Sequence, residues 1–242
     1  INLDGENLQS LGQVNTSKLQ LSDKWILSRL ARLNKELSTL YQNYGLGEAA
    51  KSLYEFAWSD FCDWYLELIK PRLNLKDNAT SLQLEDQKVA RQVLVNVLSK
   101  LFVMLHPLMP HLTEELWHVI NGVEENDLLA LQSWPLFEEN NLNDSLEGNF
   151  SSLFEAIRTV RNLRAIAGLK PSQSAPIIFV SSRQEILDIL NLTKGEIITL
   201  TRANKVNIFE EEAFDKLKSD KSLSSVVGDL QIILPIQGLI DV

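Results

Sequence analysis

Over the first two thirds of the chain, apolar and polar positions alternate with the period of α-helices. After the polar stretch 1–21, Ser22 has the residue type and position of a helix N-cap, because a helical pattern starts directly after it. The apolar positions of this pattern are Trp25, Ile26, Leu30, Leu33, Leu37, Leu40 and Tyr44. Glycines in "NYGLGEA" interrupt the pattern. A second helix is predicted from about Gly47 to Lys70, where Pro71 ends it.

A third helix is predicted from about Leu84 to Leu105. Its segment "VLVNVLSKLFVML" is apolar on nearly all sides, which indicates deep burial. Two prolines then precede a short helix, "HLTEELWHVI", and the acidic, Asn-rich stretch 121–148 is predicted to be a long loop around "LLALQSWP". A further helix is predicted from roughly Leu146 to Ala167, with Gly168 and Pro171 as its stop signals.

After Pro171 the period changes. "APIIFVS" and "KVNIF" have the pattern of strands, and "RQEILDIL" and "KGEIITLTRA" that of short helices. "SSVVGDLQIILPI" consists of two apolar runs separated by Gly228-Asp229, which predicts a β-hairpin. The predicted fold class is mainly α. It has an irregular N-terminal linker at 1–21, a helical bundle at 22–171 and a small α+β subdomain at 172–242.

The second predicted helix holds an unusual density of aromatic residues, in "YEFAWSDFCDWYLELIKPRL". At 100° per residue, Tyr54, Trp58 and Trp64 fall within one wide apolar arc, with Cys62 at its edge. Phe56 falls on the opposite side, among acidic residues. We therefore expect the aromatic residues of the arc to be core.

Composition limits the possible classes of protein. The chain has 242 residues, 45% of them hydrophobic, which suits one large or two small domains. It contains no apolar run of about 18 residues, the length expected of a transmembrane helix. Its N-terminus has neither signal-peptide features nor a Met, which indicates a fragment or a processed product. A single cysteine permits no internal disulfide and favours a reducing compartment.

The formal net charge is −9, which argues against a generally basic nucleic-acid binder. The charge is unevenly distributed, however. Residues 120–150 contain seven acidic residues and no Lys or Arg, whereas residues 151–175 contain four basic residues and one acidic residue, a net charge of +3. Net charge is therefore a poor guide to what one face of the molecule binds.

Candidate catalytic and metal-binding residues are few. Cys62 has acidic neighbours, which raise rather than lower a thiol pKa, so we interpret it as a small buried hydrophobe and not as a nucleophile. His111, Glu115 and His118 share one helical face, but a metal site needs further ligands from another helix. We favour a helix face directed at solvent and predict no metal. No phosphate-binding glycine loop and no G-x-S-x-G motif is present, so we predict no catalytic residues.

Basic residues form the better candidate site. Arg158, Arg161 and Arg164 follow one another at three-residue spacing and would form a slanting ridge on a helix. Guanidinium groups suit phosphate oxygens, although such ridges are equally common as solvated faces. A second, weaker basic row on the first predicted helix comprises Arg29, Arg32 and Lys35.

Five motifs occur in an order that identifies a family: "SDKWILSRL", "YEFAWSDFCDWYLELIKPRL", "LHPLMPHLTEELW", "LQSWP" and "IRTVRNLRAIAGLKPS". Together they resemble the C-terminal part of the valyl-tRNA synthetases, a family of class I aminoacyl-tRNA synthetases. "INLDG" resembles the end of the segment that joins the catalytic core to this part, and "QGLIDV" the point just before a C-terminal coiled coil. "LHPLMPHLTEELW" is shared loosely with the isoleucyl, leucyl and methionyl enzymes, whereas the other motifs favour the valyl type.

The resemblance implies a helical bundle that binds the anticodon stem-loop of tRNA(Val), with a small α+β subdomain behind it. The parent enzyme would use ATP and Mg to attach valine to tRNA(Val), and would hydrolyse mischarged tRNA in an editing domain. This chain has no HIGH-type or KMSKS-type motif, so we expect it to be non-catalytic and without a cofactor. The resemblance also leads us to expect that the bundle's usual opening helix, upstream of "INLDG", is missing. The expected partners are tRNA(Val) and the catalytic domain of the same parent chain, in a cytoplasmic monomer without a membrane.

The residues predicted to contact RNA were chosen by charge and are Arg158, Arg161, Arg164, Lys170, Arg29, Arg32 and Lys35. The alternative is a helical protein-interaction scaffold, in which the arginine ridge docks an acidic partner or the rest of the synthetase.

Overall fold

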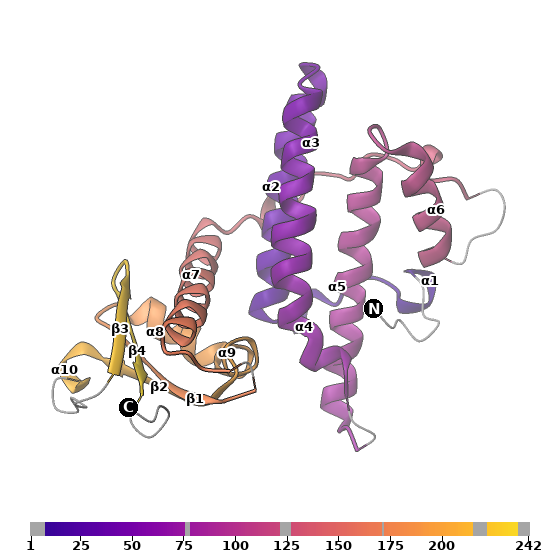
Figure 1. Ribbon diagram of the computed structural model, residues 1–242. Coiled ribbons are helices and arrows are strands. Elements are labelled where there is room, and N and C mark those ends of the chain that lie inside the picture. Colours follow the sequence, from indigo (N-terminus) through magenta and orange to yellow (C-terminus); the bar gives the residue numbers. More distant parts are fainter. Residues whose placement is uncertain (1–7, 76–77, 122–126, 171, 215–221, 237–242) are drawn as a thin grey trace. The chain divides into compact units, whose positions relative to one another are not determined.

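The computed structural model describes residues 8–75, 78–121, 127–170, 172–214 and 222–236 (Figure 1). "INLDG", Pro171 and "QGLIDV", on which several expectations depend, lie outside these residues. The chain divides into two compact units, Ile1–Asn143 and Asp144–Val242. The fold class is confirmed: helices make up the first unit, and helices and a small sheet make up the second.

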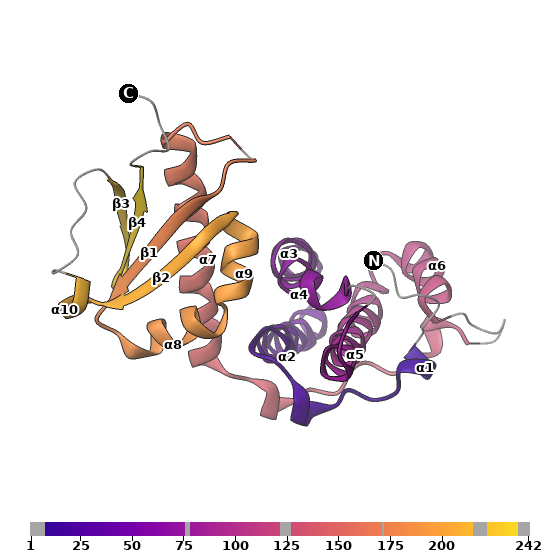
Figure 2. The ribbon, with the colours of Figure 1, turned by 90° about the horizontal axis from the view of Figure 1, so that it is seen from below.

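The first unit consists of helices packed side by side. In Figures 1 and 2, α2, the rod formed by α3 and α4, and α5 lie next to one another, and α6 lies beside α5. The elements are α1 (Leu8–Leu11), η1 (Thr16–Lys18), α2 (Leu21–Gln42), α3 (Leu46–Glu55), η2 (Phe56–Tyr65), α4 (Leu66–Leu73), α5 (Ser81–Leu105), α6 (Pro110–Asn121), η3 (Leu129–Leu131) and η4 (Glu139–Asn141). The four predicted helices of this part of the chain are all present.

The start of α2 differs from the prediction by two residues. Ser22 is buried in the first turn, and Gln20 occupies the N-cap position, where its backbone N–H donates to the Asp23 carboxylate over 3.0 Å. An acidic side chain at this position satisfies a backbone donor that the helix leaves unpaired. The preceding stretch is not wholly irregular either. It contains α1 and η1, and the Leu11 carbonyl accepts a hydrogen bond of 2.8 Å from Gln92 on α5.

The second predicted helix is a continuous rod made of α3, η2 and α4, and η2 is a π-helix. The backbone N–H of Leu66 donates to the carbonyl of Phe61, five residues back, as π-helical geometry requires. Pro71 was expected to end the rod at Lys70, but it lies inside the last turn of α4. Its missing N–H costs little there, because the helix ends at Leu73 and few hydrogen bonds remain to be made.

The π-helix changes which aromatic residues are buried. Trp64 is buried, as predicted, but Tyr54 and Trp58 are exposed, and Phe56, expected on the polar side, is buried. The expected apolar arc assumed 100° per residue throughout the helix, whereas each π-helical turn contains more residues than an α-helical turn. Side chains on the two sides of this stretch therefore shift in phase relative to one another. The expectation that the whole aromatic arc is core was wrong for Tyr54 and Trp58.

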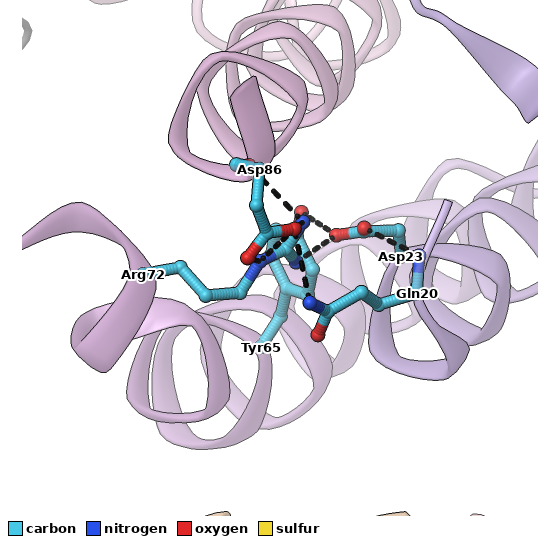
Figure 3. Close-up of polar contacts among 5 residues, drawn as sticks. All are labelled: Gln20, Asp23, Tyr65, Arg72 and Asp86. Atoms are coloured by element: carbon cyan, nitrogen blue, oxygen red, sulfur yellow. Dashed lines mark hydrogen bonds and ion pairs between the residues drawn. The ribbon is translucent and has the colours of Figure 1, made fainter. Parts of the chain in front are cut away.

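A buried polar network joins three parts of the first unit (Figure 3). The Asp23 carboxylate accepts hydrogen bonds from the Arg72 guanidinium over 2.8 Å and from the Tyr65 hydroxyl over 3.0 Å. Arg72 also donates to Asp86 on α5 over 2.9–3.1 Å, and the Gln20 amide donates to the same carboxylate over 2.9 Å. Desolvation and the charge of Asp23 raise the pKa of Tyr65 well above its usual value. The network ties α2, the rod and α5 together.

The second unit contains a helix and a four-stranded sheet with short helices. Its elements are α7 (Asp144–Ile166), β1 (Ala175–Ser181), α8 (Gln184–Leu192), α9 (Lys194–Thr201), β2 (Ala203–Glu210), α10 (Glu211–Phe214), β3 (Ser222–Val227) and β4 (Leu230–Pro235). The strand order is β2-β1-β4-β3. β1 pairs parallel with β2, through the crossover of α8 and α9, and β4 pairs antiparallel with β1 and β3. The predicted hairpin turns at Gly228, where φ is +53°.

The compact units divide at a different place from the predicted boundary at 171/172. The predicted bundle included α7, but α7 packs against β3, β4, α8 and α9 of its own unit. Its buried residues Phe150, Ile157 and Val160 form part of the core beneath the sheet. The division follows because a sheet with one apolar face must cover that face with a helix. None of the described helices is long and apolar enough to span a membrane.

Candidate RNA-binding surfaces

The basic row of α2 is only partly exposed. Arg29 donates to the Asp60 carboxylate over 2.8 Å, so its charge is offset within the unit. Arg32 is half-buried, and Lys35 is exposed, with its ammonium group 5.7 Å from the centre of the Phe137 ring. An ammonium group at this distance attracts an aromatic face. Lys35 is therefore the member of this row that presents its charge most openly.

A hollow near the C-terminal end of α2 contains aromatic side chains that the charge-based choice of residues missed. It is lined by Ser38, Tyr41, Gln42, Pro107 and Trp134. The rings of Tyr41 and Trp134 meet edge to face, with centroids 5.5 Å apart. In the sequence, the signal was the Trp-Pro pair of "LQSWP", which was used as a family motif but not as a site.

The "LQSWP" segment is held on α2 by Asn34, which is buried. The Trp134 indole donates to the Asn34 side-chain oxygen over 2.8 Å, and the Asn34 amide donates to the Pro135 carbonyl over 2.9 Å. Both polar ends of Asn34 are thereby satisfied, as a buried amide requires. The hollow thus has a fixed aromatic wall.

The three arginines of α7 do not share one exposed ridge. Arg158 and Arg161 are exposed, whereas Arg164 is only 7% exposed and donates to the Gln173 carbonyl. At about 100° per residue, the six residues from Arg158 to Arg164 make one full turn and about 240° more. Arg164 therefore points about 120° away from Arg158 and reaches the buried side. Arg161 donates to the Leu200 carbonyl over 3.2 and 3.3 Å. The expectation of a single ridge was wrong for Arg164.

Another arginine joins this group from a distant part of the sequence. Arg202 follows α9, is exposed and has a left-handed backbone with φ of +54°. Burial, and secondly the positive charge of Arg202, lower the pKa of Arg164. The end of α9 therefore brings a further positive charge towards α7. Arg202 lies outside the basic stretch 151–175, so the local charge pattern could not indicate it.

Lys170 lies in the turn that follows α7. Gly168, with φ of +67°, ends the helix, and the Leu169 N–H donates back to the Arg164 carbonyl over 3.0 Å. These are the features of a Schellman motif, as the stop signal at Gly168 predicts. The Gln173 N–H donates to the Lys170 carbonyl over 3.0 Å, and the Lys170 side chain is exposed. Arg164 therefore helps to shape the loop that presents Lys170.

Cys62 departs from its expectation, whereas His111 and Glu115 are exposed, as expected of a helix face directed at solvent. Cys62 is exposed, which corrects its interpretation as a buried hydrophobe. Partial desolvation and the nearby Asp63 raise its thiol pKa, so the site does not activate a nucleophile. His118 faces Glu114 at 3.5 Å. Across the described ranges, no group of three or more His, Cys, Asp and Glu residues could hold a metal ion.

Comparison with known proteins shows which family the chain resembles. A family model described as the anticodon-binding domain of tRNA ligase matches residues 23–179. The valine–tRNA ligases of one strain of Prochlorococcus marinus and of Parasynechococcus marenigrum are 55% and 54% identical to the chain, and that of Synechocystis sp. is 39% identical. Each match covers 100% of this chain but only 26% of the relative.

The family model covers more than half of the chain, so the chain belongs to the anticodon-binding domain family of tRNA ligases. The relatives named above are valine–tRNA ligases, and the chain corresponds to about a quarter of their length. The matched range crosses the division between the two units and includes α7. It also includes all seven basic residues chosen from the sequence.

Proposed function

We propose that this chain is the part of a valine–tRNA ligase that binds the anticodon stem-loop of tRNA(Val). The observation that carries the proposal is the family match over residues 23–179, supported by relatives that are more than half identical over the whole chain. Attachment of valine to tRNA with ATP and Mg is assigned to the remainder of the full-length enzyme, which we expect to work in the cytoplasm.

Two surfaces suit the two chemical parts of a stem-loop, one in each unit. Unpaired loop bases stack on aromatic side chains, and the hollow beside Tyr41 and Trp134 offers such walls, with Lys35 and Phe137 also on or beside α2. Stem phosphates need positive charge, and Arg158 and Lys170 are exposed in the second unit. Arg161 could contribute one face of its guanidinium while bonded to Leu200.

The alternative function, an arginine ridge that docks an acidic protein, has less support. It requires three arginines on one exposed face, but Arg164 is buried. Arg161 is also engaged with the end of α9. The other exposed charges, those of Arg158 and Lys170, do not form a single ridge. They suit phosphates, which are spaced along an RNA backbone.

Binding of labelled tRNA(Val) to this chain, followed by fluorescence anisotropy at several salt concentrations, tests the proposal. We expect tighter binding of tRNA(Val) than of the same tRNA with an exchanged anticodon, and an affinity that falls with salt. Equal affinity for the two tRNAs would exclude specific anticodon recognition by this chain. Absence of binding to both at low salt would exclude RNA binding by it altogether.

A further inference from the structure

An apolar stripe runs along the exposed side of the rod formed by α3, η2 and α4. It consists of Ala50, Tyr54, Trp58, Cys62 and Leu66, each four residues after the one before. Tyr54 is 65% exposed and Trp58 58% exposed, and their rings stack in parallel planes with centroids 6.3 Å apart. Two large aromatic side chains stacked in solvent expose apolar surface that is costly to leave in water.

The π-helix keeps this stripe on one side of the rod. In an α-helix a four-residue step overshoots one turn, so residues spaced by four wind slowly around the axis. A π-helix takes more than four residues per turn, so a four-residue step there falls short of one turn and offsets the overshoot in the flanking α-helices. Tyr54 in the last turn of α3 and Trp58 and Cys62 in η2 therefore remain on one side of the rod. π-helical turns are frequent at functional sites, which favours a functional role for an apolar stripe aligned on one.

The side of the rod next to the stripe is acidic. A parallel row, also at four-residue spacing, consists of Lys51, Glu55, Ser59, Asp63 and Glu67. From Leu46 to Lys70 the sequence has five acidic and two basic residues, and Arg29 of α2 pairs with Asp60, so the rod together with this arginine has a net charge of −2. RNA phosphates are repelled by such a surface, so nucleic acid is an unsuitable occupant despite the aromatic rings. A protein segment with apolar anchors and basic flanking residues is complementary to it.

We propose that the apolar stripe is a docking surface for another segment of the synthetase chain, outside these 242 residues, that carries apolar residues flanked by Lys or Arg. The chain corresponds to 26% of its valine–tRNA ligase relatives, so about three quarters of such a protein is available to cover the stripe. The contact is intramolecular in the full-length enzyme. It uses other residues than RNA binding, which is proposed for the hollow beside Tyr41 and Trp134 and for the exposed Arg158 and Lys170.

Cys62 provides a probe in the middle of the stripe, since it is the single cysteine of this chain. Its alkylation by iodoacetamide is measured by mass spectrometry of the Cys62 peptide in this chain and in the full-length synthetase, each relative to the same protein in denaturant. We expect alkylation of native full-length enzyme to be slower than that of this chain by about tenfold or more, without tRNA.

Three results would overturn the proposal. Equal alkylation rates in the two proteins would show that the stripe stays exposed. Protection that appears only when tRNA is added would assign the stripe to RNA. Protection already present in this chain alone, and dependent on its concentration, would assign the stripe to a second copy.

Substitution links the protection to the stripe. In the full-length enzyme, Tyr54→Ser combined with Trp58→Ser should restore rapid alkylation of Cys62. Leu131→Ser, which changes an exposed apolar residue on η3, should leave the protection intact. In this chain alone, the midpoint of thermal unfolding of both variants should lie within about two degrees of that of the unsubstituted protein, since these side chains are exposed. Retained protection in the double variant would also refute the proposal.

Discussion

Nη1 of Arg72 lies 2.8 Å from Oδ1 of Asp23, and these two side chains are only 7% and 0% exposed. Asp23 belongs to the first turn of α2 and Arg72 to the last turn of α4, so this ion pair sets the alignment of two helices. Asp86 adds α5 to the same contact. A buried pair of this kind depends on both partners, because either charge alone would be left in a poor solvent.

Replacing Arg72 with Met is expected to destabilise the first unit by about 3–5 kcal/mol, because Asp23 keeps a buried charge without its ionic partner. All five tryptophans lie in the first unit, so urea unfolding followed by tryptophan fluorescence reports on that unit. Lys18→Met removes the exposed pair with Glu85 and should cost less than about 1 kcal/mol. Equal costs for the two variants would contradict the structural role of the buried pair.

Tyr65 should make the first unit sensitive to alkaline pH. Desolvation and Asp23 raise its pKa in the folded state, so the folded protein keeps the phenol proton at a pH where the unfolded chain has lost it. Its contribution to stability is therefore complete below about pH 10, the ordinary value, and is lost as the pH rises above it.

The Tyr65→Phe variant tests this pH dependence. At neutral pH it should be less stable by about 1.5–3 kcal/mol, through loss of the hydrogen bond to Asp23. The difference from the unsubstituted chain should narrow as urea unfolding is repeated at rising pH above about 10. A difference that stays constant through this window would show that the Tyr65 pKa is not raised by folding.

Trp64 and Trp58 lie in the same π-helix, but one is buried and the other exposed, so they should respond differently to truncation. Trp64→Ala is expected to cost about 3–5 kcal/mol, since Trp64 is buried. Trp58→Ala should cost less than about 1 kcal/mol in this chain, since Trp58 is exposed. Thermal unfolding followed by circular dichroism measures both. Similar midpoints for the two variants would mean that the phase of the π-helix is incorrect.

Arg158→Gln and Lys170→Gln are each expected to weaken tRNA(Val) binding and to reduce the salt slope of the affinity by about 1, if each side chain neutralises one phosphate. Lys205→Gln, which changes an exposed residue outside the family match, is the control. Arg164→Gln should instead lower the stability of the second unit, because Arg164 is buried and bonded to Gln173. An unchanged slope in both of the first two variants would remove those residues from the RNA surface.

Arg161→Glu reverses an exposed charge and should weaken tRNA(Val) binding with little change in the thermal midpoint. The hydrogen bonds of Arg161 to Leu200 are exposed, so their loss should cost less than about 1 kcal/mol. A large drop in the midpoint would show that Arg161 is needed chiefly to hold α9 against α7.

The predicted candidate site was altered by the fold more than the predicted elements were. Arg158, Arg161 and Arg164 were predicted from their spacing along one helix. Spacing determines the direction of each side chain around the helix axis, but not which side of the helix is buried against the rest of the unit. Packing of α7 on the sheet covers Arg164 and leaves Arg158 exposed. Arg202 and the hollow beside Trp134 depend on contacts between distant segments, so spacing within one helix could not indicate them.

The sequence by itself determined the order and approximate limits of the helices and strands, the hairpin at Gly228, and the family. These properties depend on local periodicity, on caps and turns, and on motifs that are read along the chain. Only the tertiary structure decided the phase of the rod at η2, the burial of Arg164 and the association of α7 with the sheet. Each of these follows from which apolar surfaces meet in space, since burial depends on neighbours that lie far away in the sequence.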